Sequence, residues 1–158
     1  MNVIYLLGRI AFVVIFIVSG ATKLMDIGAT ASMIGAKVIL PAQLSGLAEQ
    51  LQNALGMTVP QMMAVASGVI ELAGGLMIAA NIGTRVAAFI LILFTAAATF
   101  YFHDFWNMAG DARLDNLVHA QKNLSIIGAL LVFFVLGPWR PAMGYEEPEV
   151  VAPPAPRF

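Results

Sequence analysis

Residues 95–106 read TAAATFYFHDFW and mark the point where a long apolar run meets ionisable and aromatic side chains. The residues before this stretch have the composition of a lipid-soluble helix. Residues 119–123, HAQKN, bring a second polar cluster to the start of the next apolar run. A helix that leaves a membrane and the helix that re-enters it meet at one membrane face, so we expect the two clusters to lie together there.

The composition indicates whether the chain folds in water or in a lipid bilayer. The 158-residue chain is 60% hydrophobic and 11% charged, with a mean hydropathy of +0.87, which lies outside the range of soluble domains. The sequence therefore predicts an all-α integral membrane protein. The absence of cysteine excludes disulfides, thiolate catalysis and cysteine metal sites. A formal net charge of -1 without a large basic patch argues against nucleic-acid binding.

Four apolar stretches are long enough to cross the hydrocarbon core, which takes about 20 helical residues. They cover residues 3–22, 61–80, 85–103 and 117–137, and they predict a four-helix transmembrane bundle over residues 1–140. The first stretch also resembles a secretory signal peptide, with Arg9 before an apolar run. Lys23 and Asp26 continue it into a membrane interface, which favours a retained helix.

Two segments differ from the spans. Residues 28–60 contain several glycines, prolines and polar residues. Within them, residues 42–55 place leucines at helical spacing, which predicts an amphipathic helix that lies in the membrane interface or caps the bundle. Residues 141–158 are acidic and proline-rich, which predicts a disordered tail. Four crossings put both termini on one side. Charges near the spans discriminate weakly, but Arg85 and Arg140 lack acidic neighbours and favour cytoplasmic termini.

Glu71 lies halfway along the second span. An unpaired carboxylate there would cost several kcal/mol, so it is expected to face the bundle. Ser67, Glu71 and Gly75 recur at i, i+4 and i+8, which predicts one polar, narrow helix face. Arg9 is the predicted partner of Glu71 in an intramembrane ion pair. A structural role for this pair is favoured over a proton or substrate site.

A polar pocket is predicted at the opposite membrane face from the termini. Thr95, Thr99 and His103 form a stripe on the third span, and three polar side chains cluster at the start of the fourth. The predicted pocket comprises Lys23, Thr99, His103, Asp104, Trp106, His119, Lys122 and Asn123. These groups suit a headgroup with carbonyl oxygens, such as a quinone, an anion from the interface, or a proton relay.

Two alternatives to this pocket apply to the same side chains. The same side chains are also typical of residues that only anchor helices in the headgroup layer. Two histidines with Asp104 lack the close spacing of a metal site, so no metal site is predicted.

Several motifs resemble the DoxX family of small bacterial membrane proteins. They are Gly8-Arg9, Ser19-Gly20-x-x-Lys23-Leu24, Glu71-Leu72-x-Gly74-Gly75, Thr84-Arg85, residues 98–106 and His119-x-x-Lys122-Asn123. The resemblance covers residues 5–136, whereas residues 37–56 and the tail are less typical of the family.

The resemblance implies a four-helix bundle in a bacterial inner membrane. The family is similar to the DoxD subunit of thiosulfate:quinone oxidoreductase, which implies an accessory or quinone-interacting subunit of a membrane redox assembly. A bound quinone is then the only cofactor expected, and the partners are the lipid bilayer and a membrane protein complex. No self-contained catalytic machinery is evident, so an enzymatic role would be that of an oxidoreductase subunit. The alternative is a non-catalytic structural subunit that docks a larger membrane complex.

Overall fold

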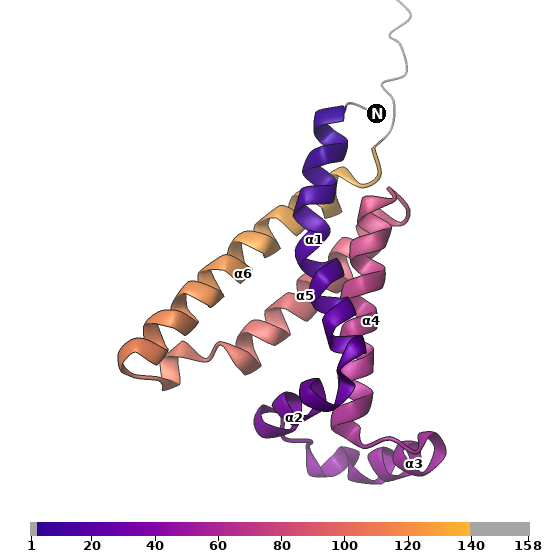
Figure 1. The fold of residues 1–158 in the computed structure, drawn as a ribbon, viewed down its shortest axis with the longest axis vertical. Helices are drawn as coiled ribbons and strands as arrows, with labels where there is room; N and C mark the ends of the chain where they lie inside the picture. The colour runs from indigo at the N-terminus through magenta and orange to yellow at the C-terminus, as the bar shows by residue number, and fades with distance from the viewer. Residues whose placement is uncertain (1–2, 140–158) are drawn as a thin grey trace, which may run out of the picture.

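The computed structural model describes residues 3–139, and this part of the chain is built from helices (Figure 1). Four helices are long and apolar enough to cross a membrane, which confirms the predicted all-α class and the number of spans. They are α1 (Val3–Met25), α4 (Val59–Ala79), α5 (Thr84–Phe102) and α6 (Gly110–Leu136). The predicted disordered tail, residues 141–158, lies outside the described residues.

Helices α1 and α4 pack closely along their length because glycines line the contact. A Cβ atom on Gly20 would lie 2.5 Å from the backbone nitrogen of Leu72 and 2.7 Å from the carbonyl oxygen of Gly68. A Cβ atom on Gly75 would lie 2.9 Å from the side chain of Ile17. In lipid, helix association relies on such close van der Waals contact, so small residues decide which faces meet.

Helices α5 and α6 form an antiparallel hairpin that starts at a tight turn after α4. Asn81 and Gly83 have positive φ angles of 63° and 56°, which reverse the chain within a few residues. The Asn81 side chain also binds the backbone of Trp139 through two hydrogen bonds of 2.8 and 3.1 Å. These contacts hold the start of α5 against the end of α6.

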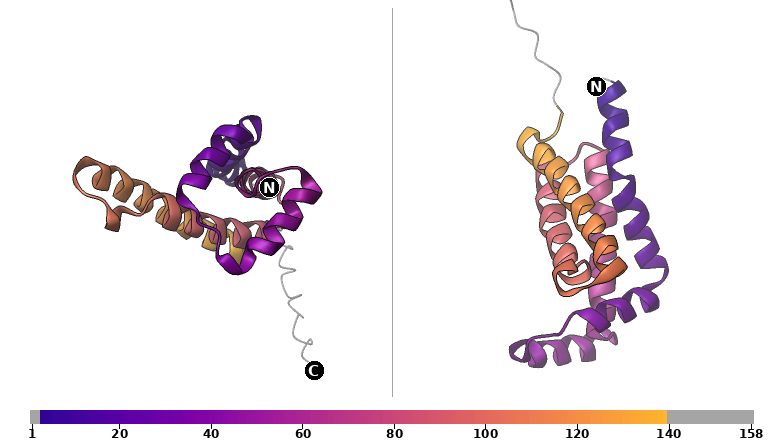
Figure 2. Two further views of the ribbon diagram at one scale, coloured as in Figure 1. Left: turned by 90° about the horizontal axis from the view of Figure 1, so that it is seen from below. Right: turned by 90° about the vertical axis from the view of Figure 1, so that its left-hand side faces the viewer.

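The hairpin leans away from α1 and α4 with increasing distance from the chain termini (Figures 1 and 2). At the terminal end Arg9 joins the elements: its guanidinium donates to the carbonyl oxygen of Ile78 at 2.6 and 3.0 Å and to Thr84 Oγ1 at 2.8 Å. The guanidinium also lies 5.3 and 5.4 Å from the ring centres of Tyr5 and Phe133. The α1–α4 pair and the α5–α6 hairpin are therefore joined at one end and diverge from each other toward the other end.

Short helices cover the other end of the bundle. They are α2 (Ile27–Lys37), the 3-10 turn η1 (Ala42–Leu44), α3 (Ser45–Leu55) and, after α5, the 3-10 turn η2 (Phe105–Asn107). The leucines of η1 and α3 are exposed, and these elements coincide with the amphipathic helix predicted over residues 42–55.

One additional helix and one helix boundary differ from the sequence expectation. Helix α2 was not anticipated; it begins where the Asp26 carboxylate accepts the backbone N–H of Ala29 at 2.9 Å, a cap that hydropathy does not reveal. Helix α6 begins at Gly110, before the predicted residue 117, because its first two turns are polar and lie outside the apolar stretch.

Candidate functional site

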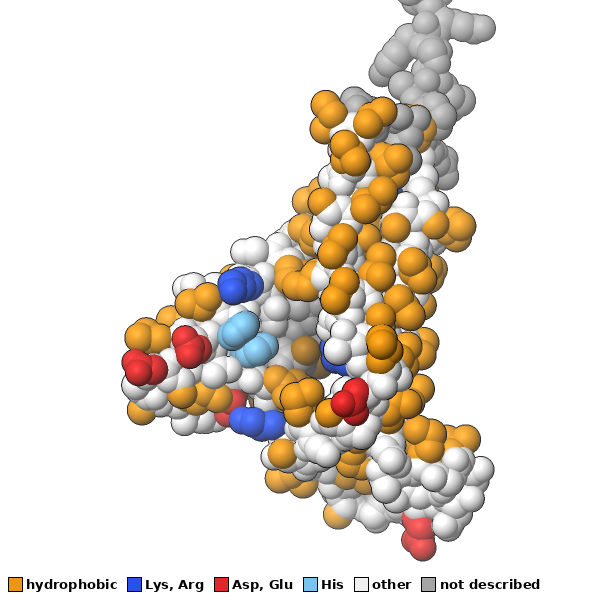
Figure 3. Space-filling model, viewed as in Figure 1, with side chains coloured by type: hydrophobic (Ala, Val, Ile, Leu, Met, Phe, Trp, Pro, Cys, Tyr) orange, Lys and Arg blue, Asp and Glu red, His pale blue; other side chains and the backbone are white. Residues whose placement is uncertain are grey.

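A cavity of about 580 Å³ lies between α1, α2, α4, α5 and α6, where the hairpin diverges from α1. Its polar lining consists of Ser19, Lys23, Thr30, Ser67, Glu71, Thr95, His103 and Asn123, and aliphatic or aromatic side chains make up the rest. Figure 3 shows a hollow between the hairpin and α1, with basic, acidic and histidine side chains around it and hydrophobic side chains over much of the remaining face. This size and this mixture are typical of small-molecule sites.

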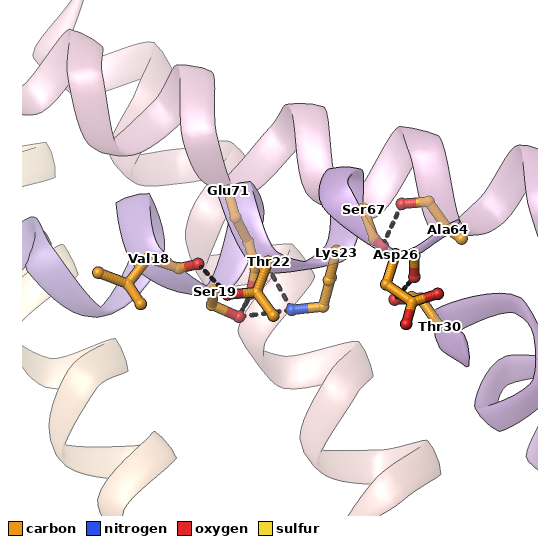
Figure 4. Close-up of polar contacts among 9 residues, drawn as sticks. All are labelled: Val18, Ser19, Thr22, Lys23, Asp26, Thr30, Ala64, Ser67 and Glu71. Carbon is orange, nitrogen blue, oxygen red and sulfur yellow. Dashed lines mark hydrogen bonds and ion pairs between the residues drawn. The ribbon is translucent and has the colours of Figure 1, made fainter. Parts of the chain in front are cut away.

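One wall of the cavity carries an ion pair in which Glu71 is buried and Lys23 is partly exposed (Figure 4). The Lys23 ammonium lies 2.5 Å from Glu71 Oε2 and donates to Ser19 Oγ at 2.5 Å. The Ser19 hydroxyl donates to both carboxylate oxygens of Glu71, at 3.1 and 3.2 Å. Ser19 and Lys23 are four residues apart on α1, so they project from the same face of the helix toward α4.

This geometry corrects the predicted ion pair between Arg9 and Glu71. Gly20 contacts the backbone beside Glu71, so Glu71 lies at the level of Ser19 and Gly20. Arg9 lies about 16 Å further along α1, at about 1.5 Å per residue. At that depth its guanidinium reaches Ile78 and Thr84 instead. The predicted partner was wrong because the depth of Arg9 in the bundle was misjudged.

The opposite wall brings together four of the predicted pocket residues. The His103 and His119 rings stack with centroids 4.9 Å apart and an interplanar angle of 13°. Asn123 Nδ2 donates to Thr99 Oγ1 at 2.9 Å, and the Thr99 hydroxyl donates to the carbonyl oxygen of Thr95 at 2.7 Å. The stripe on α5 and the cluster on α6 therefore meet, although only His103 and Asn123 of these four line the cavity.

Thr95, one of the residues that line the cavity, has a buried hydroxyl. The residue is 5% exposed, and its Oγ1 is the buried side-chain polar atom of residues 3–139 that lacks a hydrogen-bond partner. Buried hydroxyls without a partner are costly, and Thr95 is one of the residues that line the cavity. Sequence analysis placed Thr95 in the polar stripe but did not include it in the pocket.

Besides Thr99 and His119, three further predicted residues do not line the cavity. Asp104 binds Lys37 at 3.4 Å and so connects the end of α2 to the turn after α5. Trp106 packs against the rings of Phe100 and Phe105. Lys122 is exposed on α6.

Five polar lining residues were absent from the predicted pocket: Ser19, Thr30, Ser67, Thr95 and Glu71, the last of which was predicted only in the ion pair. Ser19 and Ser67 carried a signal, since each lies four residues from Lys23 or Glu71 on the same helix face. Thr30 carried none, because α2 was not anticipated. Among residues 3–139, no three histidine or acidic side chains lie close enough to hold a metal ion.

The arrangement of Arg9, the Lys23–Glu71 pair and His103 along α1, α4 and α5 follows the motifs that resemble the DoxX family. The sequence profile of that family matches residues 4–104, which is more than half of the chain. The chain belongs to the DoxX family. The matched region contains Glu71 and His103, whereas Asn123 and the rest of α6 lie beyond it.

Other comparisons agree with this assignment. This DoxX protein is 31% identical over 136 residues to the inner membrane protein YphA of Escherichia coli (strain K12), which covers 86% of this chain and 84% of the relative. No solved structure matches the chain.

Proposed function

We propose that this DoxX protein binds a quinone-like molecule in the cavity beside Lys23, Thr95 and His103, as an accessory subunit of a redox assembly in a bacterial inner membrane. The observation that carries the proposal is a cavity of about 580 Å³ whose mostly apolar lining includes Lys23, Thr95 and His103. The polar side chains suit a ligand oxygen or hydroxyl, and the apolar walls suit an apolar ligand body.

A quinone combines both properties. Its ring and isoprenoid tail are apolar, and its two oxygens lie on opposite edges of the ring. The aromatic side chains of Phe94, Tyr101 and Phe102 in the lining suit a flat ring. The Lys23 ammonium in the lining supplies a hydrogen-bond donor for one of the oxygens. The chain contributes binding and hydrogen-bonding groups, and the proposal assigns electron transfer to a partner subunit.

The membrane assignment follows from similarity to an inner membrane protein of E. coli, together with the four spans. We assign both termini to the cytoplasmic side, because Arg85 lies in the first turn of α5, on the terminal side, without an acidic neighbour in sequence.

A cavity-filling substitution tests the proposal. Ala98 lines the cavity, whereas Ala96 on the same helix is exposed and lies outside the lining. We expect Ala98→Phe to reduce binding of a short-chain ubiquinone at least roughly tenfold, since the added ring occupies the space that the ligand needs. Ala96→Phe adds the same ring outside the cavity and is the matched control.

Binding is measured on purified protein in lipid nanodiscs, with empty nanodiscs subtracted to remove partitioning into lipid. A photoreactive azidoquinone then identifies the labelled peptides, which are expected to come from α1, α4 and α5. Equal ubiquinone binding by both variants, or labelling confined to other peptides, contradicts the proposal.

A further inference from the structure

We infer that the cavity binds the hydroxyl-bearing reduced form of its ligand, a quinol, more tightly than the oxidised quinone. This inference rests on the proposed function. It follows from which polar atoms around the cavity remain able to accept a hydrogen bond and which remain able to donate one.

The first atom is Nε2 of His103. On the other side of the ring, Nδ1 lies 3.1 Å from Asn116 Oδ1. The Asn116 amide is oriented by its own helix, because its Nδ2 donates to the carbonyl oxygen of Ala112 at 2.9 Å. The amide oxygen facing the ring only accepts, so Nδ1 carries the hydrogen in the neutral imidazole. Nε2 then keeps its lone pair and acts as an acceptor.

Asn123 adds a second acceptor on the same wall. Its Nδ2 donates to Thr99 Oγ1 at 2.9 Å, and the Thr99 hydrogen is already committed to the carbonyl oxygen of Thr95. These two bonds orient the amide and leave Oδ1 as an acceptor, together with one remaining N–H. The wall formed by α5 and α6 therefore offers two acceptors, His103 Nε2 and Asn123 Oδ1, beside the remaining Asn123 N–H and the Tyr101 hydroxyl.

The wall formed by α1 and α4 presents a donor. Lys23 Nζ has three hydrogens, and Ser19 Oγ and Glu71 Oε2 take two of them. The third is available to a ligand oxygen. Thr95 Oγ1 can either donate or accept, so it does not discriminate between the two redox forms.

A quinol matches this distribution better than a quinone does. A quinol hydroxyl can donate to His103 Nε2 while the other oxygen of the ring accepts from Lys23. A quinone carries only acceptors, so its carbonyl would place a lone pair against the lone pair of Nε2. Sites that bind a hydroxyl by hydrogen bonding discriminate strongly against analogues that lack it, because the buried protein group is left unpaired.

We expect a preference of about tenfold for the quinol. For a two-electron couple this raises the midpoint potential of the bound ligand by about 30 mV relative to the free ligand. The midpoint potential rises because the reduced form of the ligand is the more tightly bound one.

The experiment compares decylubiquinol and decylubiquinone under anaerobic conditions, with the full-length protein in lipid nanodiscs. It is run at about pH 8, above the usual titration range of histidine. His103→Phe removes the acceptor and keeps an aromatic ring against His119, so the preference is expected to disappear.

Asn116→Leu provides a second variant that leaves the cavity lining intact. It removes the group that holds the hydrogen on Nδ1, so the other imidazole tautomer becomes available and the preference is expected to fall. Ser125→Ala, at an exposed α6 hydroxyl that binds only its own helix, is the control and keeps the preference.

The outcomes separate the two proposals. Equal affinity of the wild-type protein for both forms, or tighter binding of the quinone, overturns the inference and leaves the proposed function standing. Failure of both forms to bind overturns both. An unchanged preference in both His103→Phe and Asn116→Leu also overturns the inference, because the preference would then arise elsewhere.

Discussion

Glu71 and Lys23 form an ion pair in which each charge depends on the other. Glu71 is 6% exposed, and its carboxylate is bound by Lys23 and Ser19. Replacing one residue of the ion pair leaves the other side chain with an unpaired charge or forces it to change its protonation state. We expect Glu71→Leu, and likewise Lys23→Met, to lower the free energy of unfolding by about 3–5 kcal/mol.

The double variant, Lys23→Met with Glu71→Leu, serves as the control for this pair. Because neither charge remains, we expect it to be more stable than either single variant. Unfolding is followed by circular dichroism in detergent with increasing sodium dodecyl sulfate. Additive losses in the double variant contradict a direct interaction between the two side chains.

Arg9 shows how a residue can be recognised as important while its partner is misjudged. An arginine inside a predicted span indicates a structural or functional role from sequence alone. Its partners are backbone and hydroxyl oxygens near the ends of other helices, Ile78 and Thr84, which no charge pattern reveals. Only the relative depth of the helices shows them.

At the scale of the helix, the contact between α1 and α4 depends on Gly20. A Cβ atom there would overlap the backbone of α4 at Leu72 and Gly68, so the two helices would have to separate. We expect Gly20→Ala to lower the free energy of unfolding by about 1–3 kcal/mol. The measurement is the thermal midpoint of unfolding in detergent.

Gly8 offers a matched control on the same helix. A Cβ atom on Gly8 meets nothing within 4 Å. Gly8→Ala is expected to leave stability unchanged or to increase it, by up to about 1 kcal/mol, because alanine has the higher helix propensity. Equal effects of the two substitutions would show that the glycine contact does not set helix packing.

Across the whole molecule, the Lys37–Asp104 ion pair links α2 to the turn after α5. Val38 and His103, the next residue after Lys37 and the residue before Asp104, line the cavity. The link therefore lies at the end of the cavity where the hairpin diverges, which suits a restriction on ligand passage.

A cross-link tests whether this link restricts ligand passage. Lys37→Cys with Asp104→Cys in the cysteine-free chain allows a short bifunctional thiol reagent to fix the two elements together. We expect ubiquinone association and dissociation both to slow several-fold, with little change in Kd, because a restricted entrance affects both rates equally. The same double variant treated with a monofunctional thiol reagent is the control. Unchanged rates after cross-linking contradict a role for this link in ligand passage.

Membrane orientation is a prediction at the same scale. With cytoplasmic termini, α3 lies outside the cell and the turn between α4 and α5 lies inside. Glu49→Cys in α3 is expected to react with a membrane-impermeant maleimide in intact cells. Ile82→Cys, in that turn and 66% exposed, is expected to react only after permeabilisation. The reverse pattern contradicts the assigned orientation, and reaction of both in intact cells contradicts the arrangement of the spans.

The amino-acid sequence by itself determined the all-α class, the four spans and the two polar clusters beside His103 and His119. These features depend on local hydropathy and on helical spacing, which can be read within about 20 residues. The helix over residues 42–55 is predictable from the same local pattern of leucines. Helix α2 is not predictable in this way, because a side-chain cap and packing against α4 stabilise it and its apolar pattern is weak.

Only the tertiary structure decided which polar groups meet. The pairing of Lys23 with Glu71, the position of Arg9 and the cavity that contains Thr95 depend on the depth and rotation of each helix against its neighbours. Glycines such as Gly20 and Gly68 set that depth and rotation by allowing one close approach of two backbones. This packing brings residues that are distant in sequence into contact. Hydropathy along the chain does not predict such contacts.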